Sequence, residues 1–130
     1  MDDPKKKILI IDDDKFLIDM YSIKFNEAGF DVNAVFNAKE ALDKVDQGFR
    51  PDICLVDIIM PTMDGFQLVG ELKKREGFDK VHIIFLTNLG QQDDINKGME
   101  LGADGYIVKA SATPTEVVAK VNEIVSNKNK

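Results

Sequence analysis

The sequence predicts an α/β fold, a doubly wound five-stranded parallel sheet with helices on both faces. Three observations support this prediction. Short apolar runs alternate with longer segments whose apolar residues recur at helical spacing. Most of these runs are apolar throughout, as strands buried on both faces of a parallel sheet are. Glycine or proline separates many of the segments, and 130 residues suffice for one such domain.

Five segments have the length and composition of strands. Four of them are apolar runs, whereas the second mixes apolar and polar residues and is expected at a sheet edge. In chain order they are Ile8 to Ile11, Phe30 to Val35, Ile53 to Val56, Val81 to Leu86 and Gly105 to Val108. The third run organises the chain, because it ends on a carboxylate, Asp57, before a loop closed by Pro61 and Gly65.

The first three helices have recognisable starts or stops. The first is expected from about Lys15 to Ala28, with Gly29 as its stop. The second begins after Asn37, a capping residue that Glu40 complements three positions later. Asp64 is the corresponding cap of the third helix. Each helix carries an apolar stripe, so each is expected to pack one face on the sheet.

The sequence predicts that the fourth helix packs more weakly on the sheet than the fifth. The fourth, about Gln92 to Leu101, has few large apolar residues, which predicts a helix held loosely on the sheet. The fifth begins after Thr113, with Pro114 at its first position and Glu116 completing a capping box. A short polar tail, Ser126 to Lys130, follows it. We therefore expect a single domain over residues 1–130, with a core from about 6 to 126.

Five βα units leave few topologies. Because crossovers between parallel strands are right-handed, we expect the flavodoxin-like strand order 2-1-3-4-5. Strands 1 and 3 are then neighbours, so Asp12 and Asp13 after strand 1 should meet Asp57 after strand 3. Thr87 and Lys109, which follow strands 4 and 5, should flank these acids.

The acids at this edge need a counter-charge, because three ionised carboxylates brought together repel one another. Mg²⁺, or Mn²⁺ in its place, prefers carboxylate, water and phosphate oxygens, which fits Asp12, Asp13 and Asp57 with a bound phosphoryl group. The sequence has no glycine-rich phosphate loop, so Lys109 and Thr87 would hold such a group together with the metal. A carboxylate can itself attack phosphorus, which makes Asp57 a candidate for phosphorylation.

Composition excludes several other classes. The net charge of −6 disfavours sequence-independent binding to nucleic acid or anionic lipid. The single cysteine, Cys54, lies inside an apolar run and is expected in the core. The only histidine, His82, has no His or Cys nearby and is expected to fill a strand or its rim. No segment has the length of a membrane helix or a signal-peptide core, so we expect a soluble, cytoplasmic protein.

With these residues in place, the sequence resembles the receiver domain of response regulators in two-component signalling, the CheY-like domains. The likeness covers essentially the whole chain. It is carried by residues 8–14, Asp57, Met60-Pro61, Asp64-Gly65, Thr87, Gly102-Ala103-Asp104 and the segment from Tyr106 to Lys109. Single motifs of this set are weak, but all of them in register with one fold form a specific signal.

The resemblance implies roles for the acids. Asp57 is the expected phosphoacceptor, and Asp12 and Asp13 the acid pair that serves magnesium. Asp13 would be a direct ligand, and the backbone carbonyl of Ile59 would supply another. We interpret Asp14 as a helix-capping acid rather than a metal ligand.

The resemblance also implies roles around the phosphoryl group. Lys109 would pair with this group or with Asp57. Thr87 would move to bond a phosphoryl oxygen, and Tyr106 would rotate inward with it. The alternative for Tyr106 is a fixed, partly exposed aromatic residue on its strand.

By this resemblance the protein is a signalling switch that catalyses its own phosphorylation, not an enzyme that turns over a substrate. The phosphodonor would be a phosphohistidine on a sensor histidine kinase or histidine phosphotransfer protein, docked mainly on the first helix around Phe16 to Tyr21. The surface of helix 4, strand 5 and helix 5 would then bind a downstream protein. The receiver itself would be a monomer or a phosphorylation-dependent dimer. We expect a stand-alone receiver, without an output domain and without direct contact to nucleic acid or membrane.

The sequence departs from the family pattern in three places. Ala110 replaces the usual proline after the lysine, so the bond before it is either cis under strain or rebuilt in trans. Asn88 stands where a smaller residue is usual and would narrow access to the phosphate. Ile59 and Leu89 are apolar at rim positions that tune loss of the phosphoryl group, and we expect slow self-dephosphorylation because neither side chain can orient water.

Two other readings stay open. A binding module of the same fold that is never phosphorylated would lack an acid or the lysine, and all are present. A magnesium-dependent phosphatase that turns over through an aspartyl-phosphate would need a second acid to activate water and usually a cap domain, and neither is visible.

Overall fold

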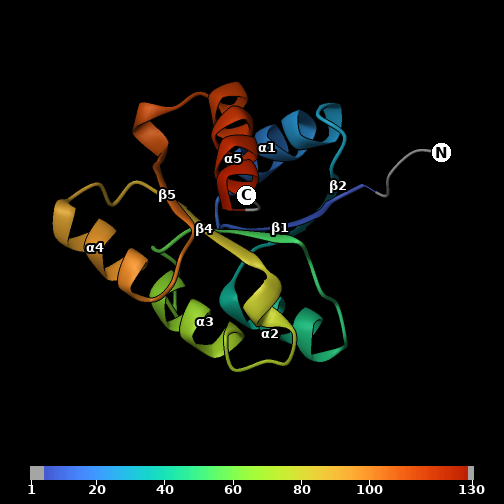
Figure 1. The fold of residues 1–130 in the computed structure, drawn as a ribbon, viewed down its shortest axis with the longest axis vertical. Helices are drawn as coiled ribbons and strands as arrows, with labels where there is room; N and C mark the ends of the chain where they lie inside the picture. The colour runs from blue at the N-terminus through green and yellow to red at the C-terminus, as the bar shows by residue number, and fades with distance from the viewer. Residues whose placement is uncertain (1–4, 129–130) are drawn as a thin grey trace.

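The computed structural model describes residues 5–128 as five strands alternating with five helices (Figure 1). The strands are β1 Lys7–Ile11, β2 Asp31–Val35, β3 Ile53–Val56, β4 His82–Thr87 and β5 Gly105–Val108. The helices are α1 Lys15–Glu27, α2 Ala38–Asp46, α3 Gly65–Leu72, α4 Gln92–Glu100 and α5 Pro114–Lys128. Short 3-10 turns occur at Phe78–Lys80 and Lys109–Ser111.

The five strands form one parallel sheet in the order β2-β1-β3-β4-β5, which confirms the predicted topology. In the register of β1 and β3, Ile11 pairs with Val56, so the next residue of each strand lies at the same edge. The N–H of Asp57 donates to the carbonyl of Ile11 at 2.9 Å. This pairing brings the acids after β1 next to the acid after β3.

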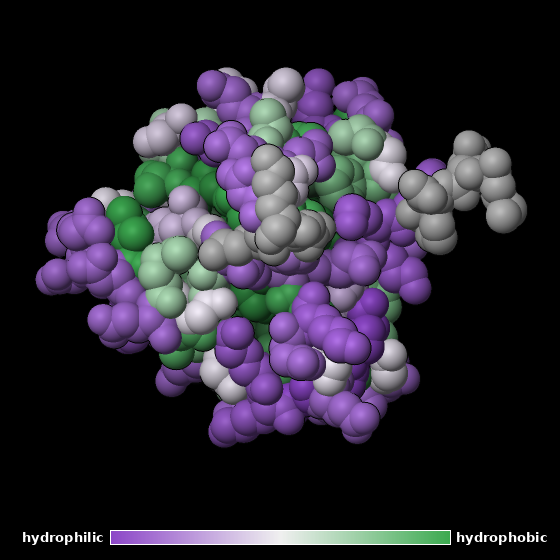
Figure 2. Space-filling model, viewed as in Figure 1, coloured by the Kyte–Doolittle hydropathy of each residue, from purple (hydrophilic) through white to green (hydrophobic). Residues whose placement is uncertain are grey.

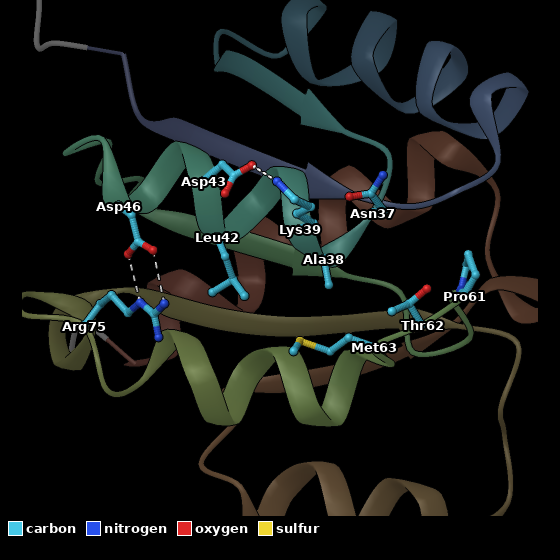
Figure 3. Close-up of a pocket in the computed structure, with 10 residues that line it drawn as sticks. All are labelled: Asn37, Ala38, Lys39, Leu42, Asp43, Asp46, Pro61, Thr62, Met63 and Arg75. Atoms are coloured by element: carbon cyan, nitrogen blue, oxygen red, sulfur yellow. Dashed lines mark hydrogen bonds and ion pairs between the residues drawn. The ribbon is translucent and has the colours of Figure 1, made fainter.

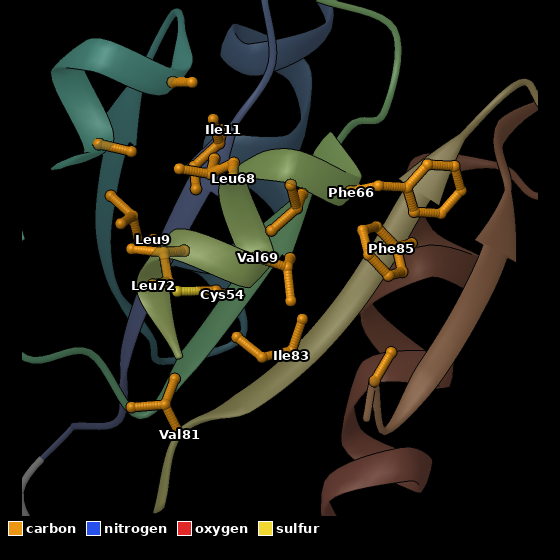
Figure 4. Packing of buried hydrophobic residues seen from close by; sticks show 14 of the residues in the cluster. Leu9, Ile11, Cys54, Phe66, Leu68, Val69, Leu72, Val81, Ile83 and Phe85 are labelled. Carbon is orange, nitrogen blue, oxygen red and sulfur yellow. The ribbon is translucent and has the colours of Figure 1, made fainter. Parts of the chain in front are cut away.

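Two apolar layers hold the helices on the sheet. In Figure 1, α1 and α5 lie on one face, whereas α2 and α3 lie on the other and α4 sits towards the β5 edge. The α2–α3 layer includes Leu9, Cys54 and Phe85, which Figure 4 shows packed beneath α3. The α1–α5 layer is built on Ile10 and Leu55. The inner strands β1, β3 and β4 thus bury side chains on both faces, which explains their apolar runs, whereas only Val35 of the edge strand β2 is buried.

The surface matches this layered core. On the face shown in Figure 2 the outer residues are mainly hydrophilic, and hydrophobic residues show chiefly in the furrows between elements. Among the described residues, no helix is both long enough and apolar enough to cross a membrane.

Several boundaries differ from the sequence prediction by a residue or two; β4, for example, runs over His82–Thr87 rather than Val81 to Leu86. β2 begins at Asp31, and the Phe30 ring packs edge-on against Phe25, with ring centroids 5.2 Å apart. α5 continues through Ser126 as far as Lys128, since the polar residues there do not break a helix.

Candidate functional site

Asp57 follows β3 directly and lies under the loop that leads to α3. The residue is only 6% exposed, and its Oδ1 accepts a hydrogen bond from the Ile58 N–H at 2.8 Å. The Gly65 N–H donates to the Ile58 carbonyl at 2.8 Å and closes the loop over the acid. A Cβ on Gly65 would overlap the Asp57 carbonyl oxygen and lie 2.7 Å from the Ile58 Cα, so this close approach requires glycine. The carboxylate is therefore held in a defined orientation.

Two further acids meet Asp57, as predicted. One oxygen each from Asp12, Asp13 and Asp57 lie within 4.8 Å of one another. Asp12 is 2% exposed, whereas Asp13 faces solvent. The Asp14 side chain accepts from the Leu17 N–H at 3.1 Å and caps α1, which confirms its capping role.

Lys109 is the cation at the centre of the acids. Its Nζ lies 2.7 Å from Asp12 Oδ2 and 3.2 Å from Asp57 Oδ2, and its side chain is 9% exposed. Burial raises the pKa of Asp12, and the hydrogen bond from Lys109 only partly offsets this rise. Burial also pulls the pKa of Lys109 down, but the bonds and charges of Asp12 and Asp57 outweigh it and hold the pKa above its ordinary value.

The charge balance of the site favours a second cation. Three carboxylates face one ammonium group, so the cluster carries an excess of two negative charges when all are ionised. A hollow of about 260 Å³ opens beside them and is also lined by Leu17, Ile59 and Asn88. Carboxylate oxygens at this spacing, one of them solvent-facing, fit a hard divalent ion that keeps several waters. The residues present are therefore suited to Mg²⁺.

Thr87 and Tyr106 do not line the hollow, but both form a hydrogen bond with Leu89. Thr87 is fully buried at the end of β4, and its Oγ1 accepts from the Leu89 N–H at 3.4 Å. The Tyr106 hydroxyl donates to the Leu89 carbonyl at 2.5 Å. Burial, with the charges of Asp94 and Asp57, raises the pKa of Tyr106 to about 12. Sequence reasoning missed Leu89 as the shared partner, because a backbone carbonyl gives no signal in the sequence.

The segment after Lys109 shows the conformation of the peptide bond before Ala110. The described residues contain no cis peptide bond, so the connection is rebuilt in trans. A 3-10 turn over Lys109–Ser111 follows, and the Ala112 N–H donates to the Lys109 carbonyl at 3.3 Å. Lys109 still reaches both acids, so the missing proline does not displace its ammonium group.

The other residues singled out in the sequence lie away from the site. Cys54 is completely buried, as expected of a core residue. His82 lies at the start of β4, at the opposite end of the strand from Thr87, and its Nδ1 is 3.5 Å from Asp104 Oδ2. Tyr21, on the helix expected to dock a partner, is only 3% exposed, so it belongs to the core rather than to that surface.

A second and larger hollow contains none of the residues predicted to bind the phosphoryl group or the metal. It has a volume of about 530 Å³ and lies between α2 and the loop into α3 (Figure 3). Leu42 and Met63 lie at its centre, and the Arg75–Asp46 ion pair, with a contact of 3.0 Å, lies at one end. Its charged groups are paired with each other, unlike the crowded carboxylates beside Lys109.

Known proteins of one family are similar in sequence to this chain over nearly its whole length. Residues 8–122 match the family described as response regulator receiver domain. The chain is 36% identical over 121 residues to the DNA-binding response regulator MtrA of Mycolicibacterium smegmatis, covering 93% of this chain and 51% of that protein. It is 35% identical over 126 residues to a probable transcriptional regulator, ycf27, of Guillardia theta, covering 97% and 48%.

Solved structures agree. The chemotaxis response regulator CheY4 of Vibrio cholerae superposes with a TM-score of 0.85 at 27% identity, covering 93% of this chain and 99% of that one. A receiver domain protein described as CheY-like, from Methanospirillum hungatei, has a TM-score of 0.83 at 28% identity, with 97% and 98% covered. The chain spans about half the length of the curated relatives it matches but nearly the whole of these structures.

Proposed function

The chain belongs to the response regulator receiver family of two-component signalling, and on that premise we propose that Asp57 accepts a phosphoryl group from a partner phosphohistidine. The observation that carries this proposal is the buried Asp57 carboxylate, held beside two further acids and one lysine. That the receiver works without an output domain stays a prediction, because the curated relatives are about twice as long.

In the proposed transfer an Asp57 oxygen attacks phosphorus, a P–O bond forms and the P–N bond to the partner histidine breaks. The histidine nitrogen keeps the electron pair of that bond and takes up a proton. Asp57 is oriented for the attack, because Ile58 N–H holds Oδ1 at 2.8 Å and Lys109 holds Oδ2 at 3.2 Å. Lys109 also offsets negative charge on the transferring oxygens.

A divalent ion would add a further positive charge at this position. Asp12, Asp13, Asp57 and the Ile59 carbonyl would hold Mg²⁺, which neutralises phosphoryl oxygens during the transfer. Asp13 is the solvent-facing member of the cluster and is suited to direct ligation. Asp12 is tied to Lys109 at 2.7 Å, which positions both groups.

The new phosphoryl group changes the contacts of Thr87. It brings a charge of about −1.5 to −2 and strong acceptor oxygens. When the Thr87 hydroxyl turns to such an oxygen, its hydrogen bond from the Leu89 N–H is strained or lost. Leu89 also accepts from Tyr106, so the β4–α4 loop and the β5 aromatic would respond together. The altered surface would be that of α4, β5 and α5.

The partner would dock beside the site on α1. Phe16 is 72% exposed and Ile59, at the rim of the hollow, is 56% exposed. Ile23, two turns further along α1, is 57% exposed. Exposed apolar residues of this size next to a reactive group are typical of a protein-binding surface, here for a histidine kinase or phosphotransfer protein.

The test is the intact mass of the protein after incubation with a small-molecule phosphodonor, with and without Mg²⁺. The wild type should gain one phosphoryl group only when Mg²⁺ is present, and Asp57→Asn should gain none. Absence of the adduct with every donor, in the presence of Mg²⁺, would instead support a binding module that is not phosphorylated.

A further inference from the structure

A glycine lies where α4 meets the aromatic side chains of the sheet. Gly98 is the only buried residue of α4. A Cβ at this position would lie 3.0 and 3.1 Å from Cδ2 and Cε2 of Phe85, and 3.1 Å from Cδ2 of Tyr106. Contacts this short require a ring or the helix to move by a few tenths of an ångström. Glycine therefore lets α4 lie closer to these two rings than a residue with a Cβ would.

The rest of α4 is weakly anchored. Gln91 precedes the helix without making a side-chain capping bond, and Met99 is 43% exposed. Glycine inside a helix also costs stability relative to alanine. A further contact is that of Lys97, whose Nζ lies 4.6 Å from the Phe66 ring centroid. The position of α4 thus depends strongly on how Gly98 meets the rings beneath it.

A contiguous series of contacts joins Gly98 to the site. The Leu89 N–H donates to Thr87 Oγ1, and the Leu89 carbonyl accepts from the Tyr106 hydroxyl. The Tyr106 ring then lies against the backbone of Gly98 and against Phe85, with ring centroids 5.9 Å apart. If the Tyr106 ring moves, its contact with the backbone of Gly98 changes, so α4 has to adjust its position or lose packing at this point.

We propose that Gly98 is the positioning residue that couples the placement of α4 to the Tyr106 ring and, through Leu89 and Thr87, to the phosphorylation site. That phosphorylation acts through this coupling rests on the proposed function, whereas the contact between Gly98 and the Tyr106 ring does not. Alanine at this position would push α4 and the Tyr106 ring apart by a few tenths of an ångström although it is the better helix former. Its effect should therefore appear at Tyr106 and in the packing of α4, not as a loss of helix propensity.

The matched control is Gly70 in α3, because a Cβ there has no atom within 4 Å. Gly98→Ala and Gly70→Ala are compared in a Tyr21→Phe background, in which Tyr106 is the only tyrosine. The first readout is tyrosinate absorbance at alkaline pH, with circular dichroism to show that the protein is folded. The second is hydrogen exchange of the backbone amides of residues 89–100 at neutral pH. This readout alone tests the proposal if the protein unfolds at the alkaline pH of the titration.

Gly98→Ala should expose Tyr106 and lower its pKa from about 12 towards the ordinary value. At about pH 11, about one tenth of the phenol is ionised if its pKa is near 12, against about nine tenths if it is near 10. The amides of residues 89–100 should exchange at least several-fold faster in Gly98→Ala, whereas Gly70→Ala should match the parent in both readouts. An unchanged Tyr106 titration in folded Gly98→Ala, or unchanged exchange in α4, would overturn the proposal.

A second arm uses beryllofluoride with Mg²⁺ as the phosphoryl mimic, with binding followed by fluorine NMR. Binding should alter α4 exchange in the parent, and most of this change should be lost in Gly98→Ala although beryllofluoride still binds. A full α4 response in bound Gly98→Ala would contradict the coupling. Failure of the mimic to bind the parent would count against the proposed function. The titration of Tyr106 in Gly98→Ala and in the parent would still test the role of Gly98.

Discussion

Replacing Gly65 by alanine tests whether the loop over Asp57 is as tightly closed as the structure shows. The new Cβ would overlap the Asp57 carbonyl oxygen and lie 2.7 Å from the Ile58 Cα and 3.0 Å from the Asp57 carbonyl carbon. These are backbone atoms, so relief requires the loop to shift by about 0.7 Å or more to reach ordinary contact distances. Such a shift also weakens the Gly65 N–H bond to the Ile58 carbonyl.

The expected cost follows from these two effects. Overpacking of a buried contact costs about 1–3 kcal/mol, and a weakened hydrogen bond about 0.5–1.5 kcal/mol. We therefore expect Gly65→Ala to lower the free energy of unfolding by about 1.5–4.5 kcal/mol. For a domain of 130 residues this corresponds to a fall in Tm of about 5–16 °C. Phosphorylation should also slow, because Ile58 would no longer orient the Asp57 carboxylate.

Urea unfolding and thermal melting measure the effect, with Gly70→Ala of the same helix as the control. Gly70 has open space around its Cα, so alanine there should be neutral or stabilise by up to about 1 kcal/mol. If Gly65→Ala unfolds within about 0.5 kcal/mol of the wild type, the reasoning about the closed loop is wrong.

Three further predictions concern the charged site and its rim. Mg²⁺ at about 100 times its Kd should raise the free energy of unfolding of the wild type by about 2.7 kcal/mol, which is measured as a rise in Tm. Asp13→Asn should lose most of this rise. An equal rise in Asp13→Asn would show that Asp13 is not a metal ligand. Burial raises the pKa of the Asp12 carboxyl group above its unfolded value of about 3.9, so the folded protein binds this group's proton more tightly than the unfolded chain does. The resulting stabilisation is fully present below about pH 4 and is lost as the pH rises through the pKa of the folded state. Asp12→Asn should flatten that part of the pH–stability curve, measured by urea unfolding without Mg²⁺, and an unchanged slope would contradict the argument. Phosphorylated wild type should lose its phosphoryl group slowly and Ile59→Asn several-fold faster, because the polar side chain can orient water; fast loss from the wild type, unchanged in the variant, would refute this view.

Much of the fold could be predicted because local signals and topology agreed. Apolar runs such as Ile53 to Val56 are short and end sharply, and the right-handed crossover rule then leaves few ways to order the strands. That order alone brings Asp12 and Asp57 together, so the acid cluster was predictable before any contact was known.

The details that were missed depend on packing between distant segments. The backbone carbonyl of Leu89, which accepts from Tyr106, has no side-chain signature. The position of Gly98 against the rings of Phe85 and Tyr106 depends on how α4 packs on the sheet, so it was not singled out from the sequence. The trans connection after Lys109 depends on whether a 3-10 turn can form there, which the motif alone did not decide.

The central claim is that Asp57 itself carries the phosphoryl group. Borohydride reduces an aspartyl-phosphate to homoserine, so reduction after phosphodonor treatment, followed by peptide mass mapping, identifies the modified residue. The account predicts homoserine at position 57, only when Mg²⁺ and donor are both present, and none in Asp57→Asn. Homoserine at Asp12 or Asp13 in the wild type, or a phosphoryl adduct that persists in Asp57→Asn, would contradict it.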